Sequence, residues 1–392
     1  MTTNHPQTSS QDARRRGRDV FLRFSSVPRK RESRSPEGQW VISRRDDLLW
    51  FQGSALVGLA LLVCFSQTPA LTNATYNATH PAVLLLLLWG IVFDGTHVWA
   101  TYTRSYLAPD QPSRSALPGV WSWGVVFVGP LLALLDYWLC APSPSQLAQA
   151  GLLFRAFLVV AYLWAYWHLV RQHYGFLMLY RRSAGETSRA GARLDAFVLW
   201  AGCLYPYLRF SLSNAYSQSG LLPTVPSALH ASARFGLDVA VVLTLTVLLG
   251  LIVTERWERL QLGPKHLFLT IVIAFHLLVF SILENLLTLT ATLTIFHNLQ
   301  YHRIVWQYEH GLGRIPMGNL ATYLFVGVLF GVAWYGPRFG GVAVAQSDLT
   351  RNILLGLGWG FAFHHYVVDG MIWHVRRSPA VVAALAARQV HA

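Results

Sequence analysis

The sequence alternates long apolar stretches with short polar connections, and this alternation limits the possible folds more than any other feature. Crossing about 30 Å of hydrocarbon takes about 20 mostly apolar residues in a helix. From residue 49 onward, about ten stretches reach roughly that length. The alternation predicts an all-α fold, a polytopic integral-membrane helix bundle with about ten transmembrane helices. The stretches are 49–66, 82–101, 119–140, 151–171, 195–213, 235–254, 267–285, 287–306, 319–337 and 352–374.

The composition supports a membrane protein and excludes other classes. Hydrophobic residues make up 53% of the 392 residues and charged residues only 12%, whereas about 25% of an average soluble domain is charged. Such a chain is too apolar to be disordered or to bind nucleic acid.

The basic residues collect on alternate connections between the apolar stretches. Each basic connection contains at least one arginine, for example Arg104, Arg181, Arg256 or Arg376. Basic residues accumulate on the cytoplasmic side of a membrane, and the basic N-terminal tail belongs to the same set. We therefore predict that both termini are cytoplasmic, in a multi-pass protein of a bacterial inner membrane. The opposite connections, nearly free of Lys and Arg, are 67–81, 141–150, 214–233 and 338–351.

Three regions follow from this pattern. Residues 1–48 are predicted to be a disordered basic cytoplasmic tail, residues 49–377 a histidine-rich transmembrane catalytic domain, and residues 378–392 a short cytoplasmic tail. The first tail can bind anionic membrane lipid, or it can simply keep this end of the chain in solution. Both readings stay open.

A long apolar run at 267–306 decides the topology of everything after it. Its only turn signal is Glu284-Asn285. If the run were one long helix, every later segment would cross the membrane in the opposite direction. Arg376 and Arg377 would then lie on the external side, against the charge pattern. We therefore predict two transmembrane helices that meet at this pair.

Most of the 15 histidines lie in or beside the apolar stretches. Ionisable side chains inside a membrane are costly, so they normally face the interior of the bundle and mark a functional site. A single histidine can simply join two helices by hydrogen bonds, and this reading suits His276 or His374 taken alone. A whole group favours a metal site. The predicted ligands are His97, His168, His173, His276, His297, His302, His364 and His365.

The histidines also share one depth in the predicted topology. They stand about six to eleven positions from the basic residues at the cytoplasmic ends of their helices, as His97 does from Arg104. At a rise of about 1.5 Å per residue, all lie within roughly 17 Å of the cytoplasmic edge. Histidines from distant stretches thus share one layer, which favours a metal or haem site over unrelated polar contacts.

Imidazole suits such a site because it is a neutral nitrogen ligand for iron, copper or zinc. Its second ring nitrogen needs an acceptor of its own. Asp94 shares a helical face with His97, and Asp369 shares one with His365. Each aspartate could be that acceptor, a ligand, or merely the partner of a nearby Arg or Trp.

The spacing of the histidines favours two ions. His168 and His173, like His297 and His302, are five residues apart, which is about 140° around a helix. Either a π-bulge brings the two rings together, or each ring serves a different ion. The adjacent pair at 364–365 also points in two directions. We therefore predict a dinuclear centre.

The sequence contains two motifs with histidines five residues apart, HLVRQH and HNLQYH, and the pair HH at 364–365. These histidine boxes resemble those of the membrane-bound histidine-rich di-iron enzymes, such as fatty-acid desaturases, alkane hydroxylases and carotenoid hydroxylases. A looser likeness is to bacterial membrane oxygenases that cleave β-carotene. The resemblance implies two non-haem iron ions, activation of dioxygen, a lipid-soluble small-molecule substrate and a cytoplasmic electron donor. The expected function is hydroxylation, desaturation or cleavage of that substrate in lipid metabolism.

Two other functions compete with the di-iron oxidoreductase. Facing histidines could ligate haem iron, and intramembrane histidines could form a metal or proton transport path. A hydrolase is disfavoured because the sequence has no GxSxG, HExxH or Gly-rich phosphate loop. Aromatic residues beside the boxes, among them Tyr301 and Trp373, fit a substrate pocket or the interfacial aromatic belt, and we favour the belt.

Overall fold

The computed structural model describes residues 39–67, 81–107, 119–140, 151–214, 216, 225–259, 263–313, 319–345, 347–373 and 385. The chain divides into two units, Met1–Pro36 and Glu37–Ala392, and all the described residues belong to the second. The predicted tails 1–48 and 378–392 lie largely outside the described residues, as does His374.

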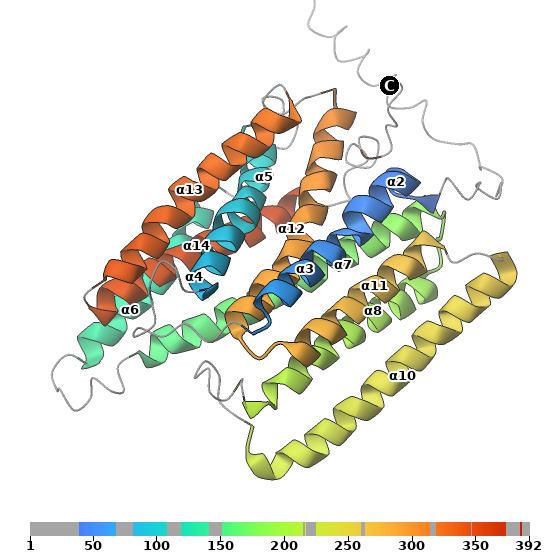
Figure 1. The fold of residues 1–392 in the computed structure, drawn as a ribbon, viewed down its shortest axis with the longest axis horizontal. Helices are drawn as coiled ribbons and strands as arrows, with labels where there is room; N and C mark the ends of the chain where they lie inside the picture. Colours follow the sequence, from blue (N-terminus) through green and yellow to red (C-terminus); the bar gives the residue numbers. More distant parts are fainter. Residues whose placement is uncertain are drawn as a thin grey trace, which may run out of the picture. The chain divides into compact units, whose positions relative to one another are not determined.

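All the regular structure in the described residues is helical (Figure 1). The all-α prediction is confirmed. Several helices contain a wider π-helical or a tighter 3-10 stretch, labelled η. In chain order the elements are α2 Arg44–Asp46, η3 Asp47–Gln52, α3 Ser54–Phe65, α4 Pro81–Leu87, η4 Leu88–Asp94, α5 Gly95–Ser105, η6 Val120–Phe127, α6 Val128–Cys140, α7 Leu152–Ser183, α8 Arg189–Ser211, α10 Ser227–Arg259, α11 Pro264–Ile282, α12 Leu286–Gly311, α13 Leu320–Val344 and α14 Asp348–Ile372.

Within the described residues, six helices are long and apolar enough to cross a membrane. The remaining predicted stretches fall on α8, α12, α13 and α14. Of these, α12 carries buried histidines and amides, and α14 carries two buried histidines and the buried Asp369. The count of ten crossing helices and the cytoplasmic position of both termini stay predictions. The six are Arg44–Phe65, Pro81–Ser105, Trp121–Leu139, Leu152–Ser183, Ser227–Glu255 and Pro264–Ile282.

The run at 267–306 forms two helices, as predicted. Helix α11 ends at Ile282 and α12 begins at Leu286. Between them Leu283 and Asn285 have extended backbone, and the side-chain oxygen of Asn285 accepts a hydrogen bond from the backbone N–H of Leu287 at 2.9 Å. A side-chain acceptor at this position satisfies one of the free N–H groups at a helix start, so the Glu284-Asn285 signal marks a real helix boundary.

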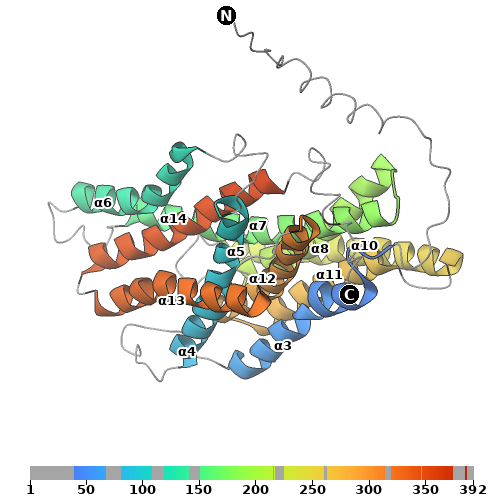
Figure 2. The ribbon, with the colours of Figure 1, turned by 90° about the horizontal axis from the view of Figure 1, so that it is seen from above.

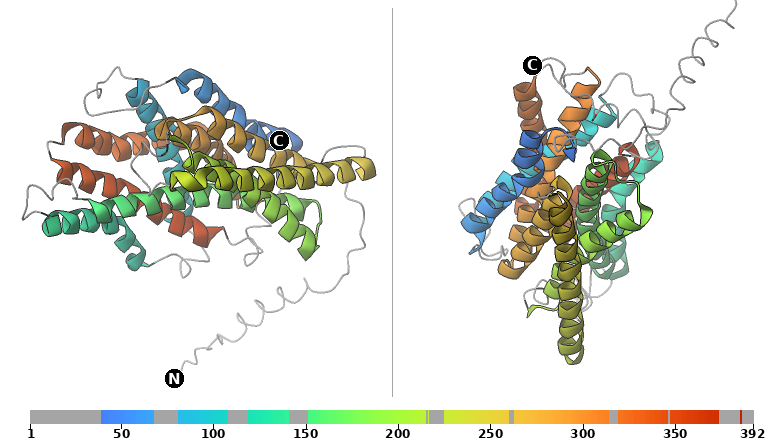
Figure 3. Two further views of the ribbon diagram at one scale, coloured as in Figure 1. Left: turned by 90° about the horizontal axis from the view of Figure 1, so that it is seen from below. Right: turned by 90° about the vertical axis from the view of Figure 1, so that its right-hand side faces the viewer.

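Four helices enclose the space that holds His97, His168, His297 and His365. Both α12 and α14 pack against α5 and against α7. Helices α6 and α13 pack on α14, while α8 and α11 pack on the other side of α7 (Figure 2). Helix α10 packs on α8 and runs along the edge of this unit (Figure 3). The enclosed space is therefore lined by α5, α7, α12 and α14.

Helix α13 approaches η4 and α5 closely because both sides carry glycine. A Cβ atom on Gly331 would lie 2.1 Å from the carbonyl oxygen of Ile91, and one on Gly95 would lie 2.6 Å from the Cα of Gly331. Small residues allow helix backbones in a membrane to come this close. The contact fixes the segment that leads directly into His97.

This packing predicts that Gly331→Ala destabilises the protein by about 1–3 kcal/mol, as overpacking of a tight interior does. Gly336→Ala is the matched control on the same helix, because a Cβ there meets nothing within 4 Å. It should leave stability unchanged or raise it by up to about 1 kcal/mol. Thermal unfolding of the purified variants measures both effects. Equal melting temperatures for the two variants would contradict the contact.

Candidate metal centre

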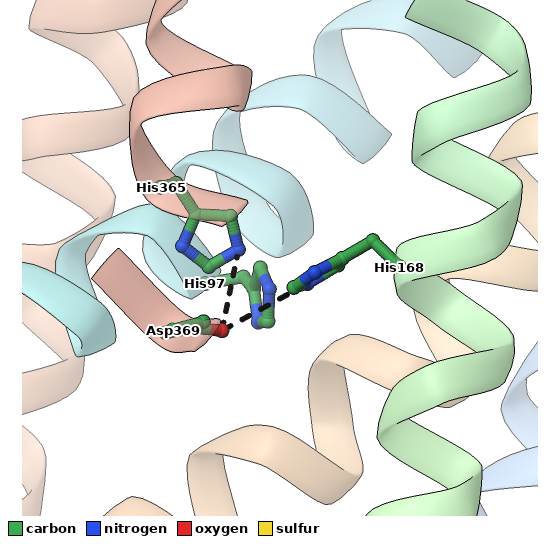
Figure 4. Close-up of side chains that lie close together, drawn as sticks. All are labelled: His97, His168, His365 and Asp369. Atoms are coloured by element: carbon green, nitrogen blue, oxygen red, sulfur yellow. Dashed lines mark ion pairs between the residues drawn. The ribbon is translucent and has the colours of Figure 1, made fainter. Parts of the chain in front are cut away.

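Three histidines and one aspartate converge between α5, α7 and α14. They are His97, His168, His365 and Asp369, and one ligand atom from each lies within 4.8 Å of all the others (Figure 4). Atoms bound to one ion at about 2 Å lie at most about 4 Å apart. The group therefore needs only a small inward movement to hold one metal ion.

Asp369 is oriented so that one carboxylate oxygen faces the histidines. Its Oδ1 accepts hydrogen bonds from the hydroxyls of Thr101, at 2.9 Å, and Tyr301, at 2.6 Å. Its Oδ2 lies 3.7 Å from Nε2 of His365 and 3.8 Å from Nε2 of His168. Of the roles left open for Asp369, this geometry favours that of a ligand.

The hydrogen bonds around Thr101 also select the tautomer of His365. Because Thr101 donates its only hydroxyl hydrogen to the Asp369 carboxylate, its oxygen must accept from Nδ1 of His365, 2.8 Å away. A neutral imidazole with its hydrogen on Nδ1 has a lone pair on Nε2. That Nε2 is the atom that faces Asp369, so His365 presents a lone pair to the centre.

A further layer holds Tyr301 in place. The indole N–H of Trp373 donates to the Tyr301 hydroxyl at 3.2 Å. The guanidinium of Arg104 lies 3.9 Å from the centroid of the Trp373 ring and donates to the carbonyl of Ile372 at 3.0 Å. Arg104 thereby fixes the C-terminal end of α14, three to four residues after Asp369. Through Trp373 and Tyr301 it also holds the Asp369 carboxylate in position.

The buried nitrogen atoms of this group fit a metal ion. Nearly all buried polar atoms in proteins have a hydrogen-bond partner. Among the described residues, Nε2 of His168 and Nε2 of His365 are buried with none, although they lie beside Asp369. The Nε2 lone pair of His365, the unpartnered Nε2 of His168 and a carboxylate oxygen face one space. Nitrogen and oxygen atoms of these kinds are ligands that a divalent metal accepts.

His297 of α12 lies next to this group. Its Nε2 is 3.3 Å from Nε2 of His97, and its ring centroid is 5.3 Å from that of His168. Its Nδ1 is buried without a partner within the described part of the chain. His297 is thus a further candidate ligand, either for the same ion or for a second one.

His173 and His276 form a separate buried pair. Their ring centroids are 5.5 Å apart, and neither ring belongs to the group of four. The pair is separate because α7 is a regular α-helix through both of its histidines, so His168 and His173 point about 140° apart. Of the two alternatives for the five-residue spacing, the π-bulge is not found in α7 or α12.

His302 is held by hydroxyl groups instead of by the other histidines. Its Nε2 is 2.9 Å from Oγ1 of Thr96, and its Nδ1 is 3.3 Å from the hydroxyl of Tyr323. Both ring nitrogens are therefore engaged. The structure does not bring His302 to the metal centre, because five residues of regular helix turn it away from His297.

His364 likewise points away from its neighbour His365. Its Nδ1 is 3.2 Å from the hydroxyl of Tyr102, and its Nε2 is 3.3 Å from Oγ of Ser122. Its ring stacks on that of Trp123 with centroids 3.9 Å apart. Adjacent helical residues point about 100° apart, which explains why only His365 reaches the centre.

The sequence left the role of Asp94 beside His97 open, and in the structure its carboxylate has a partner on α13. The hydroxyl of Tyr335 donates a hydrogen bond to the Asp94 carboxylate. Asp94 and His97 both line one cavity. Because Tyr335 belongs to α13, its hydrogen bond to Asp94 favours a structural role for Asp94 in holding α13 against η4.

Two cavities meet at the metal centre. The apolar cavity has a volume of about 90 Å³ and is lined by His97, His168, His297 and His365 together with residues such as Val159. The basic cavity, of about 1430 Å³, is lined by His168 and Asp369 and by the arginines Arg171, Arg181, Arg182, Arg189 and Arg193. The centre is thus accessible from two chemically different sides.

Sequence reasoning missed three side chains that position the ligands. Thr101 has no distinguishing pattern, because threonine is common in helices. Tyr301 and Trp373 were assigned to the interfacial belt, but they lie in the hydrogen-bonded layer behind Asp369. Tyr301 lies one helical turn after His297, and Trp373 lies one turn after Asp369. This spacing was the sequence signal that could have placed both side chains near the metal centre.

No protein-family model matches the sequence, and no curated protein or solved structure matches it either. What the protein does must therefore be inferred from the centre itself.

The Thr101 hydrogen bonds predict that Thr101→Val lowers metal affinity by about 10–100-fold, the usual effect of losing a group that orients ligands. Thr103→Val is the control, because Thr103 is also buried on α5 but donates to the carbonyl of its own helix at Ala100. Competition with a metal chelator measures both affinities. Equal affinities of the two variants would show that Thr101 does not orient the ligands.

Proposed function

We propose that this protein is an integral-membrane, metal-dependent oxidoreductase with a non-haem iron centre. His97, His168, His365 and Asp369 would hold the iron. The observation that carries the proposal is the convergence of three imidazoles and one carboxylate inside an apolar helical bundle. Iron bound there would activate dioxygen for hydroxylation, desaturation or cleavage of a lipid-soluble substrate. The expected location is a bacterial inner membrane.

The ligand types support iron as the metal. Mixed imidazole and carboxylate ligands suit divalent iron in oxygen-using enzymes, in which two histidines and one carboxylate leave positions open. The carboxylate of Asp369 offsets one of the two positive charges of the ion. A lower net charge reduces the cost of holding the ion at membrane depth.

The residues of the chain perform the remaining tasks. Thr101 and Tyr301 hold the Asp369 carboxylate and leave its Oδ2 toward the ligands. The apolar cavity, with side chains such as Tyr166 and Leu293, excludes water and receives hydrocarbon. The basic cavity gives the centre a polar approach at the arginine-bearing end of α7, where a cytoplasmic electron donor would act.

The resemblance to the histidine-rich di-iron enzymes is part of this proposal, and so is a second iron ion. The side chains available for a second ion are His297, 3.3 Å from His97, and the pair His173 and His276. The count of iron ions per chain is a quantity that the experiment below measures.

The two competing functions fit the geometry less well. A haem needs a flat space between its two axial ligands, but the ring centroid of His97 lies 4.5 Å from that of Tyr301 and 4.6 Å from that of His365. Transporters place their sites at broken helices, whereas α7 and α14 are continuous through their histidines.

The adjacent histidines of α14 provide the test. In His365→Ala a metal ligand is removed, so we expect the purified protein to lose most of its iron. Cells that produce this variant should also lose the oxidised lipid product that cells producing the parent protein contain. In His364→Ala we expect iron and product to remain, because His364 contacts Tyr102 and Trp123 instead. The measurements are iron per chain by elemental analysis and mass spectrometry of the lipids of the producing cells.

Two results would contradict the proposal. One is full iron content and unchanged lipid products in His365→Ala. The other is a purified parent protein that takes up no iron under reducing conditions while it remains folded. An intense Soret band in the parent would instead favour the haem alternative.

A further inference from the structure

The pair formed by His173 of α7 and His276 of α11 lies outside the metal centre. Both rings are completely buried, and their centroids lie 5.5 Å apart with the ring planes at 85°. Among the described residues, neither nitrogen of His173 nor Nε2 of His276 has a hydrogen-bond partner. Nearly all buried polar atoms in proteins are paired, so three unpartnered ring nitrogens in one buried place indicate a missing partner.

The hydrogen bonding of His276 leaves one nitrogen able to bind an ion. Its Nδ1 lies 2.8 Å from the carbonyl oxygen of Val272, and a carbonyl oxygen can only accept. In the neutral ring Nδ1 therefore carries the hydrogen and Nε2 carries a lone pair. Histidine ligands of metals typically donate their other ring N–H to a backbone carbonyl in this way. His276 is thus already in the form that binds a metal.

His173 has a matching arrangement with Gln300 of α12. The side chain of Gln300 lies next to His173. Its Nε2 donates to the carbonyl of Phe51 at 2.6 Å, which fixes the orientation of the amide, while its Oε1 is buried without a partner in the described part of the chain. This oxygen is the acceptor available to one ring N–H of His173. The other ring nitrogen then carries a lone pair.

The separation of the two rings suits one ion between them. Two imidazoles that bind an ion at about 2 Å from opposite sides have their ring centroids about 6 Å apart. The centroids of His173 and His276 lie 5.5 Å apart, and the two rings are not hydrogen-bonded to each other. Each ring can rotate about its bond to the ion, so the angle of 85° between the planes is no obstacle.

The ligands favour an ion with a single charge. Within the described residues, no cysteine, carboxylate or further histidine completes a metal-binding group with the pair. A divalent ion such as zinc usually takes four ligands, and two uncompensated charges are costly at membrane depth. Copper(I) carries one charge, accepts imidazole and is stable with two ligands in a line. The rings of Phe268 and Phe296, at 6.1 Å and 5.1 Å from that of His173, keep water away from it.

We propose that His173 and His276 bind one copper(I) ion at a site of its own, separate from the iron centre. His173 lies about 7.5 Å along α7 from His168 and about 140° around it, whereas the two ions of a dinuclear centre lie about 3.5–4 Å apart. The pair is therefore not the second half of a dinuclear iron centre, and His297 remains the candidate for that role. The copper site rests on the pair alone and does not depend on the proposed function.

Titration with copper(I) tests this site. Purified protein, loaded with iron beforehand, competes for copper(I) with the coloured chelator bicinchoninate under anaerobic conditions with ascorbate. We expect one copper(I) per chain. His173→Leu and His276→Leu should each weaken copper(I) binding by more than about 100-fold, because removal of a ligand costs more than the 10–100-fold loss caused by removal of an outer partner. Circular dichroism like that of the parent shows that a variant is folded.

His302→Gln is the matched control. His302 is also a buried histidine, but hydroxyl groups engage both of its nitrogens. Its replacement should leave copper(I) binding unchanged. X-ray absorption at the copper K-edge of the parent needs no variant at all. It should show two nitrogen neighbours with imidazole scattering and the intense pre-edge feature of two-coordinate copper(I).

The outcomes separate the copper site from the iron proposal. His365→Ala should lose iron and still bind one copper(I), because it changes no part of the pair. No copper(I) binding by the parent would overturn the site, and so would unchanged binding in folded His173→Leu and His276→Leu. Copper with sulfur neighbours or with four ligands would also overturn it. If folded His276→Leu lost its iron, the pair would belong to the iron centre and the separate site would be wrong.

Discussion

Buried imidazole nitrogens that need partners inside an apolar bundle determine how this protein is organised. Hydrocarbon cannot hydrogen-bond to them, so each must find a polar group or an ion. Two arrangements of the histidines stand out in the structure. His302 and His364 contact hydroxyl groups of neighbouring helices, whereas His97, His168 and His365 turn toward one another and toward a carboxylate. Only the second arrangement leaves lone pairs that a metal ion can use.

Asp369 connects this centre to the rest of the fold. Its carboxylate is fixed by Thr101 of α5 and Tyr301 of α12, and His365 lies one turn before it on α14. The hydrogen bonds thus join three helices at the point where a ligand must be held still. Because the same carboxylate reaches the basic cavity, the ligand set lies at the boundary between an apolar and a charged space.

The sequence predicted the features that depend on position along a helix, and it failed on those that depend on which helices face each other. Apolar length and the Glu284-Asn285 pair predicted helices and a real helix boundary. The four-residue spacing predicted that His365 and Asp369 share a face. The helical repeat explains why His302 and His364 point away from the centre. Which side chain each of them contacts instead depends on tertiary packing alone. Thr101 was missed for the same reason, because its role depends on α14 lying beside α5.

Iron K-edge X-ray absorption of the iron-loaded, purified protein tests the central claim most directly. Bound by this group, the iron should have only nitrogen and oxygen neighbours at about 2 Å. Outer-shell scattering should correspond to three or four imidazole rings. The Asp369→Asn variant should show a changed oxygen contribution. A spectrum with sulfur neighbours, with the scattering of a porphyrin, or with no imidazole scattering would contradict the account.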